Sequence, residues 1–266
     1  RRWLPVNMYI GGAEHAVLEL HRLWPEAPIF TSVANVEKLG PLNTADIRTT
    51  RLQKLYELVG RHQPLLPLLP RAMETIDLKG YDVIVSSSHA VGKGIIPSSR
   101  SVHICYCHTP MRYAWEMEDS YLQDFRIPRI FYKRIRRMLK SLRRWDLASA
   151  KRVDAFIANS KETQQRIALT YGRESTVIPP PVDHRFFEPP LVPMNDRKGF
   201  LAVGRLVPYK RFDLLIDVAN QLELPLMIVG RGQEEARLRR MAGPTVSFRT
   251  DVTDSELPSL YTRAKA

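Results

Sequence analysis

Cysteine is scarce in this sequence. The only two, Cys105 and Cys107, lie two residues apart in a presumed strand. At that spacing the side chains share a face, and their geometry is poor for a disulfide. Two thiols without a second Cys/His pair at ligand spacing also make no zinc site. We therefore expect free thiols, no bound metal and a reducing compartment.

Long apolar runs are also missing. No stretch approaches the roughly 18 consecutive apolar residues of a membrane span. The first residues, RRWLPVNMYIGG, lack the apolar centre of a signal peptide. We expect neither a membrane span nor export, and hence a cytoplasmic protein. With 266 residues, 44% of them hydrophobic, the chain is long enough to bury a sizeable core.

Acidic residues are fewer than basic ones, with 28 Asp and Glu against 40 Lys and Arg, so the net charge is +12. The excess is concentrated between Arg129 and Arg152, where ten Lys and Arg accompany one acid, Asp146. A block of this kind points to a phosphate-rich partner, which can be nucleic acid, anionic lipid or a charged substrate.

Part of this block predicts a basic amphipathic helix over residues 131–146. Its apolar stripe consists of Phe131, Ile135, Met138, Leu139, Leu142 and Trp145, with seven Lys and Arg on the other faces. Two interpretations stay open. The stripe can be core, with solvated charges around it, or the helix can dock on anionic lipid at the cytoplasmic leaflet.

Short runs rich in β-branched residues alternate with helical patterns along the chain. These runs predict fully buried strands at residues 28–33, 81–88, 102–107, 154–160, 175–180, 200–204, 224–230 and 245–248. Between them lie apolar residues at helical spacing, such as Leu214, Leu215, Val218 and Leu222. Alternation of strands and helices predicts an α/β fold whose parallel sheets are covered on both faces.

A proline-rich segment separates two predicted domains. Six prolines fall within the fifteen residues 179–193 and interrupt every periodic pattern. We predict an N-terminal domain over residues 1–183, a linker over 184–198 and a second domain from 199 to 266. The second part is shorter than an ordinary domain of about 100–150 residues, so we expect it to be incomplete in this sequence.

Several predicted strands end in loops that suit phosphate binding. The strand at 200–204 leads through Arg205 and Lys210 to a helix expected from about Arg211. Two cations at a helix N-terminus make a site for a phosphate or diphosphate, although surface cations without a ligand are the alternative. Gly230 and Gly232 follow the next strand, where glycine allows close backbone approach.

The strand at 102–107 ends at His108, directly before a Thr-Pro pair. In α/β folds, ligands bind beyond the carboxyl ends of the strands, so this histidine is a candidate site residue as well as a candidate structural one. We expect it to face the cleft in which the second domain presents Arg205 and Lys210. Gly11 and Gly12 precede a predicted helix and offer a second glycine loop.

Together these features resemble the retaining glycosyltransferases of family 4, which have the GT-B fold of two facing Rossmann-like domains. The likeness is carried, in order, by GGAEHAVLEL (11–20), YDVIVSSS (81–88), CYCHTPMRYAWE (105–116), VDAFIANSKETQQRIALTYGRESTVIPPPVD (153–183), FLAVGRLVPYKRFDLLIDVA (200–219), LMIVGRGQE (226–234) and VTDSELPSLYTRA (252–264). The third segment looks most like bacterial mannosyltransferases that use GDP-mannose to build O-antigen or other surface polysaccharides.

The resemblance implies transfer of a hexose, with mannose as the predicted sugar, from a nucleotide-diphosphate sugar. It also implies that the anomeric configuration is kept and that no metal or other cofactor is needed. Arg205 and Lys210 match the cations that hold the donor diphosphate and stabilise the leaving group. Gly12 matches a glycine that approaches the diphosphate, and His108 matches a histidine near the reacting sugar. The remaining donor-pocket residues by this resemblance are Gly11, Gly204, Gly230, Gly232 and the loop around Val252.

The resemblance also implies partners and a location. We expect a nucleotide-sugar donor, a glycolipid or oligosaccharide acceptor, and a protein in the cytoplasm or docked on the inner face of the cell membrane. Family members carry a donor-binding glutamate pair beyond the position of Ala266, so we expect catalysis from the parent protein.

Three alternatives stay open. The first is a UDP-sugar donor. The second is a basic protein that binds nucleic acid. Residues 131–146 count against it, because no base-reading side chains lie among their cations. The third is a transferase fold kept as a non-catalytic partner.

Overall fold

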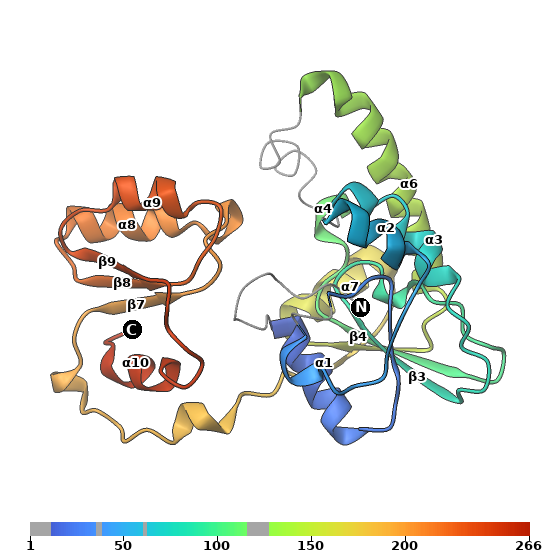
Figure 1. Ribbon diagram of the computed structural model, residues 1–266, viewed down its shortest axis with the longest axis horizontal. Coiled ribbons are helices and arrows are strands. Elements are labelled where there is room, and N and C mark those ends of the chain that lie inside the picture. Colours follow the sequence, from blue (N-terminus) through green and yellow to red (C-terminus); the bar gives the residue numbers. More distant parts are fainter. Residues whose placement is uncertain (1–11, 36–38, 61–62, 116–127) are drawn as a thin grey trace. The chain divides into compact units, whose positions relative to one another are not determined.

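The computed structural model describes residues 12–35, 39–60, 63–115 and 128–266. These residues form two compact units, with the boundary in the chain between Pro181 and Val182 (Figure 1). The strands within each sheet are parallel, so the predicted α/β class with parallel sheets is confirmed. Residues 182–198 belong to the second unit, in which the ring of Phe186 lies 5.7 Å from that of Tyr261.

The first unit contains helices and strands in alternation. In chain order they are α1 (Gly12–Leu23), β1 (Ile29–Thr31), η2 (Gly40–Leu42), β2 (Ile47–Thr49), α2 (Leu52–Val59), η3 (Gln63–Leu65), α3 (Leu69–Glu74), β3 (Val83–Ser88), η4 (Gly92–Gly94), β4 (Val102–Cys107), α4 (Arg112–Trp115), η5 (Arg129–Phe131), α6 (Tyr132–Ala150), β5 (Ala155–Ala158), α7 (Lys161–Tyr171) and β6 (Thr176–Val177).

These strands form two sheets. One pairs β1 with β2, and the other has the order β3-β4-β5-β6. The expectation of fully buried strands is wrong for β3, where Val83 and Val85 are 60% and 38% exposed, and also for β4, β5 and β6, each of which begins with an exposed residue. A mainly apolar cavity of about 870 Å³ runs along β3 and is also lined by α1 and β1. The strand β3 is therefore paired with β4 on one edge and borders this cavity.

Helix α6 is held in the first unit by its C-terminal half. Leu139 and Leu142 are buried in the largest core cluster. The ring of Trp145 packs so closely on Gly94 that a Cβ there would lie 2.2 Å from it, and Trp145 Nε1 donates a hydrogen bond to Glu74. The C-terminal half of the amphipathic stripe is thus core, as one of the two sequence interpretations proposed.

A buried ion pair joins the same helix to η4. Lys93 and Asp146 are both fully buried and form a salt bridge. The Asp146 carboxylate also accepts hydrogen bonds from Trp115 Nε1 at 2.8 Å and from the Tyr171 hydroxyl at 2.9 Å. Burial, with this carboxylate beside it, raises the pKa of Tyr171. Four segments of the unit therefore meet at one buried carboxylate.

The second unit is a smaller parallel sheet with helices on both faces. It contains η6 (His184–Phe187), η7 (Met194–Asp196), β7 (Phe200–Val203), η8 (Pro208–Lys210), α8 (Phe212–Gln221), β8 (Leu226–Val229), α9 (Glu235–Met241), β9 (Val246–Arg249) and α10 (Leu257–Arg263). The strand order is β7-β8-β9. Helices α8 and α9 cover one face and α10 covers the other (Figure 1).

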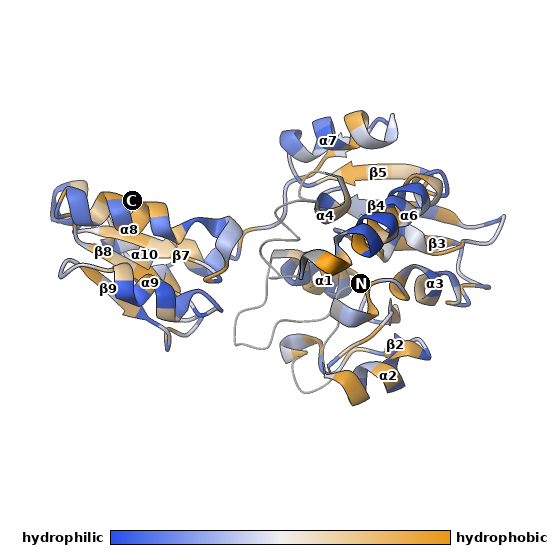
Figure 2. Ribbon diagram, turned by 90° about the horizontal axis from the view of Figure 1, so that it is seen from above, coloured by the Kyte–Doolittle hydropathy of each residue, from blue (hydrophilic) through white to orange (hydrophobic). Residues whose placement is uncertain are grey.

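The apolar pattern predicted for α8 is wrong in detail. Its buried residues are Phe212, Ile216 and Ala219, which pack on the sheet. The four apolar residues expected at helical spacing are instead exposed, namely Leu214, Leu215, Val218 and Leu222. Two stripes of the required period coexist on this helix, and the stripe with the bulkier first residue, Phe212, is the one that is buried. Apolar residues on α8 appear in orange in Figure 2.

None of the helices that the structure describes is both long enough and apolar enough to cross a membrane. The two cysteines are free, and both are buried on β4.

Candidate active site

The carboxyl ends of β3, β4 and β5 meet at one edge of the larger sheet. Because the strands are parallel and in register from Ser88 to Ala158, the residues that follow them are neighbours. The backbone N–H of His108 donates to the Ser88 carbonyl at 2.8 Å, and that of Asn159 reaches the Cys107 carbonyl at 3.4 Å. This edge therefore continues the sheet by one residue beyond β4 and places His108 there.

The His108 side chain is held from two sides. Its Nε2 lies 2.8 Å from the Ser87 hydroxyl at the end of β3, and its ring meets the ring of Tyr106 edge-on at 5.2 Å. The backbone is held too, since Thr163 Oγ1 in α7 donates to the His108 carbonyl at 3.1 Å. Sequence reasoning singled out His108 but missed Ser87, although a run of three serines ending a strand was a visible signal.

A second Ser–His pair lies nearby on the same two strands. The Ser86 hydroxyl is 2.8 Å from Nε2 of His103, whose Nδ1 lies 3.2 Å from the Arg152 carbonyl. His103 is fully buried, and this burial lowers its pKa. With both ring nitrogens satisfied inside the protein, His103 is a structural residue, in contrast to the half-buried His108.

The glycine loop predicted in the first unit is described in part. Gly11 lies outside the described residues. Gly12 is the first residue of α1, and Glu14 in the first turn of that helix is completely buried. Glu14 occupies a position at which the helix dipole favours an acidic side chain.

The second unit presents its loops at the carboxyl edge of β7 and β8. Gly204 N–H donates to the Val229 carbonyl at 3.0 Å, and Leu206 N–H donates to the Arg231 carbonyl at 2.9 Å. These bonds extend the β7–β8 ladder into the loop that carries Arg205. The Leu206 side chain is buried in the core, so its neighbour Arg205 is turned to solvent.

Tyr209 lies between the two predicted phosphate-binding cations. Its hydroxyl accepts from Arg205 Nη2 at 3.4 Å, and Lys210 Nζ lies 5.9 Å from the centre of its ring. All three side chains are exposed. Within the described part of the chain, neither Arg205 nor Lys210 forms an ion pair. The loop therefore gathers two positive charges that an anion can reach, and Tyr209 is a candidate site residue that the sequence analysis missed.

Helix α8 follows this loop and begins at Phe212, after the short turn η8 and a left-handed residue, Arg211, with φ of 52°. The Arg211 guanidinium is 3.0 Å from Asp213 Oδ1 in the first turn and lowers the pKa of that carboxyl. Arg211 thus neutralises the one acid in this turn, and the positive character of the neighbouring loop rests on Arg205 and Lys210.

Gly230 and Gly232 are required by the packing of the two loops. A Cβ at Gly230, where φ is +146°, would lie 2.0 Å from the Gly204 carbonyl oxygen, and one at Gly232 would lie 2.1 Å from that of Leu206. Close backbone approach was predicted for these glycines, and the approaching group is the protein's own β7–α8 loop. The predicted role in a nucleoside pocket stays a prediction.

Val252 is fully buried beside Val229 and Leu257, on the α10 face of the sheet. The side chain is therefore core, and any donor contact in this region would come from other atoms of the loop.

The structure divides the predicted site residues between the two units. His108 and Gly12 lie in the first, and Gly204, Arg205, Lys210, Gly230, Gly232 and Val252 lie in the second. Within the second unit the loops after β7 and β8 are brought together by backbone hydrogen bonds. Among the described residues, no group of three or more His, Cys, Asp or Glu side chains could hold a metal ion.

Comparison with known proteins identifies the family. The model of Glycosyltransferase Family 4 matches residues 10–186, which is more than half of the chain. The protein belongs to this glycosyltransferase family. The match includes α1, the Ser87–His108 pair and α7, and it confirms the resemblance to family 4.

A solved structure supports the fold of the whole chain. The crystal structure of Anabaena Alr3699/HepE in complex with UDP aligns with a TM-score of 0.59 at 16% sequence identity, covering 98% of this chain and 71% of that one. The fold of this family 4 glycosyltransferase is therefore GT-B, as the sequence analysis predicted. No curated protein sequence matches the chain.

Proposed function

We propose that this family 4 glycosyltransferase moves a hexose, with mannose as the first candidate, from a nucleoside diphosphate sugar to a lipid-linked or polysaccharide acceptor. The observation that carries this proposal is the cluster of Arg205, Tyr209 and Lys210 at the carboxyl edge of β7. Its two exposed cations sit next to backbone that already forms a tight, glycine-dependent turn.

The diphosphate is the part of the donor that this cluster suits best. A guanidinium and an ammonium that make no ion pair among the described residues can both donate charge-assisted hydrogen bonds to phosphate oxygens. As the bond to the sugar breaks, negative charge grows on the diphosphate, and fixed cations stabilise this charge more than they stabilise the intact donor. In our proposal Arg205 and Lys210 fill the electrostatic role that a metal ion has elsewhere, so transfer proceeds without a metal.

His108 has a different role in the proposal. Its Nε2 is engaged by Ser87, which fixes the ring orientation at the carboxyl edge of the sheet. In this proposal His108 hydrogen-bonds a hydroxyl of the reacting sugar or steadies the positive charge that develops at the anomeric carbon. The departing phosphate would take the acceptor's proton, so that the anomeric configuration is kept without a protein general base.

The donor base has two candidates. GDP-mannose is favoured by the YCHTPMRYAWE segment. A UDP-sugar is favoured by a different observation, since the HepE structure with the same fold was crystallised with UDP. We further propose that the acceptor belongs to bacterial envelope glycan synthesis and that transfer takes place on the cytoplasmic side of the membrane.

A nucleotide panel on the intact chain tests the proposal. GDP, UDP, dTDP and ADP are compared by thermal shift, and the best of them is then titrated by calorimetry. Lys210→Ala should weaken its binding by about 1.5–3 kcal/mol, the value of a hydrogen bond to a charged group. Arg240→Ala, which removes an exposed cation from α9, is the matched control and should bind as the parent does.

Two results would reject the proposal. One is equal binding of nucleotide by Lys210→Ala and the parent protein. The other is a full-length protein that binds a nucleotide diphosphate yet transfers no sugar to any lipid-linked or oligosaccharide acceptor, which would favour the non-catalytic alternative.

A further inference from the structure

The two halves of α6 have different surroundings. The C-terminal half is core, as Leu139, Leu142 and the Lys93–Asp146 pair show. The N-terminal turns, together with η5, extend beyond α2 and α3 in Figure 1. Ile135 and Met138 are partly buried against the core cluster, whereas the residues at the start of the stripe are exposed in the part of the chain that the structure describes.

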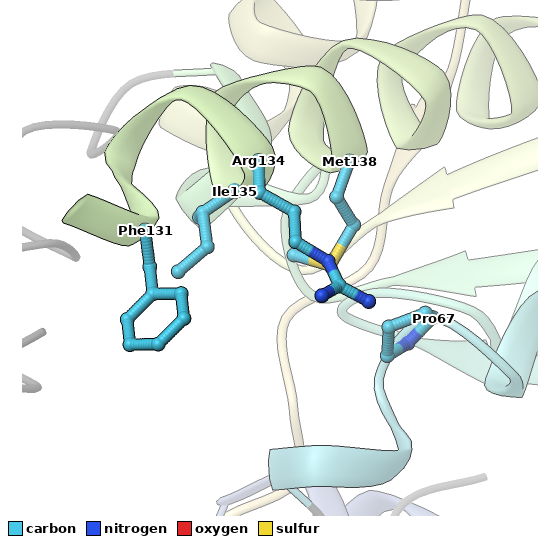
Figure 3. Close-up of a pocket in the computed structure, with 5 residues that line it drawn as sticks. All are labelled: Pro67, Phe131, Arg134, Ile135 and Met138. Carbon is cyan, nitrogen blue, oxygen red and sulfur yellow. The ribbon is translucent and has the colours of Figure 1, made fainter.

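These turns expose large apolar side chains. Ile130 is 82% exposed and Phe131 is 45% exposed. Behind them lies an open pocket of about 450 Å³ lined by Pro67, Phe131, Arg134, Ile135 and Met138. Figure 3 shows Phe131, Ile135 and Met138 directed to the same side of the helix, with Arg134 reaching toward Pro67. Contiguous apolar surface rimmed by polar groups is typical of an interaction site.

The rim of this surface is positively charged. Exposed cations of the helix include Lys133, Arg134, Arg137, Lys140 and Arg144. Asp146, the one acid within α6, is buried in its ion pair with Lys93 and does not pair with these exposed cations. Hydrophilic residues are correspondingly prominent on α6 in Figure 2. The partner of this surface should therefore be anionic and should also offer an apolar phase.

We propose that η5 and the N-terminal half of α6 dock on an anionic phospholipid membrane, with Ile130 and Phe131 in the interfacial layer and the cations on lipid phosphates. Interfacial helices of this type combine an apolar face with Lys and Arg on the polar face. A bilayer accommodates both features at once. Nucleic acid would satisfy the cations alone, and a second copy of the chain would bring two sets of like charges together.

This inference deepens the proposed function, because a membrane-docked transferase can reach a lipid-linked acceptor. It nevertheless has its own experiment, which requires no sugar transfer. The intact chain is mixed with phosphatidylcholine vesicles or with vesicles that also contain phosphatidylglycerol, and bound protein is measured by flotation. We expect binding to the anionic vesicles only, and weaker binding as salt is added.

Charge variants test the role of the cations. Each Lys or Arg near an anionic surface contributes about fivefold in affinity, so K133Q/R137Q/K140Q should weaken vesicle binding by roughly a hundredfold. The matched control K54Q/K79Q/R100Q removes three exposed cations from other parts of the first unit. Its net charge is therefore the same as that of K133Q/R137Q/K140Q. It should bind vesicles nearly as tightly as the parent protein does.

An apolar variant separates lipid from other polyanions. Ile130→Asn keeps every cation and, at so exposed a position, should not unfold the protein. It should weaken vesicle binding by about tenfold, the loss expected for one apolar side chain that leaves the interface. It should not change binding to a random-sequence oligonucleotide.

Three outcomes would overturn the inference. They are vesicle binding unaffected by Ile130→Asn, equal losses in the two triple variants, and an Ile130-dependent self-association without vesicle binding, which would assign this face to a second copy. Nucleotide affinity, measured on the same variants, should stay unchanged. A chain that binds nucleotide but not vesicles would reject membrane docking alone. A chain that binds vesicles but not nucleotide would reject the proposed transfer reaction alone.

Discussion

The Ser87 hydroxyl lies 2.8 Å from Nε2 of His108, and this hydrogen bond ties the end of β3 to the residue that follows β4. The two strands are neighbours in the sheet, with Ser87 directly opposite Tyr106. A rigid sheet edge thus sets the position of the one histidine that we assign to the reaction. Ser87 is in this view a positioning residue.

Removing the Ser87 hydroxyl should affect turnover more than donor affinity. A neutral hydrogen bond contributes about 0.5–1.5 kcal/mol, so Ser87→Ala should lower kcat about 3–10-fold with a small change in KM. Ser87→Thr keeps the hydroxyl and should recover most of the activity. Ser99→Ala, at an exposed serine, serves as the control. In a His108→Ala background Ser87→Ala should have no further effect, and an additive loss there would exclude the positioning role.

The loop packing of the second unit predicts a sharp difference between two glycines. Gly232→Ala would force a methyl group to within 2.1 Å of the Leu206 carbonyl oxygen, and we expect it to lower the free energy of unfolding by about 1–3 kcal/mol. In Gly204→Ala the new methyl group would meet only ring atoms of Phe212, the nearest at 3.4 Å, so this change should cost less. Urea denaturation of both variants checks this. Similar stabilities for the two would contradict the loop geometry described above.

Breaking the buried ion pair should destabilise the first unit strongly. Asp146→Asn leaves the Lys93 ammonium buried without its counter-charge, which costs about 3–5 kcal/mol in comparable sites. Replacing both residues together, as K93M/D146L, should cost less than either single change. Glu162→Gln breaks the exposed Arg166–Glu162 pair and is the matched control, with an expected loss below about 1 kcal/mol. The free energy of unfolding is measured by urea denaturation, with tryptophan fluorescence as the signal.

The buried His103 predicts a pH dependence of stability. Its folded pKa is lowered by burial, while the unfolded value is about 6.5. The unfolded chain therefore binds the proton more readily, so this contribution to stability is complete above about pH 6.5 and is lost as the pH falls toward the folded pKa. In His103→Gln the melting temperature should fall less between about pH 7 and pH 5. Ser99→Ala, which removes no ionisable group, is the control and should leave the profile unchanged.

Much of the architecture was predictable because it depends on local patterns. The eight predicted strands correspond to β1 and to β3 through β9, since runs of β-branched residues bounded by turn residues are recognisable over four to eight positions. The strand β2 was missed. It is only three residues long, and IRT carries no such run.

Faces were harder to predict than elements. On α8 two apolar stripes have the same period, and only the packing of Phe212 and Ile216 on the sheet decides which is buried. The stripe that starts at Phe131 and runs along α6 is continuous in sequence, yet it is core at Leu142 and exposed at Phe131. Apolar residues at helical spacing show that a helix has an apolar face. How much of that face is buried depends on how far the neighbouring helices and strands extend along it.

The sequence by itself determined the α/β class, the family and the residue types of the candidate site, because strand periods, glycine loops and clustered charges are properties of short segments. Only the tertiary structure decided that Ser87 holds His108, that Tyr209 joins Arg205 to Lys210, and that Gly232 makes room for a neighbouring loop. These relationships connect residues on different strands and loops. They depend on the register of parallel strands and on how the loops pack at the sheet edge, which short-range patterns in a sequence do not encode.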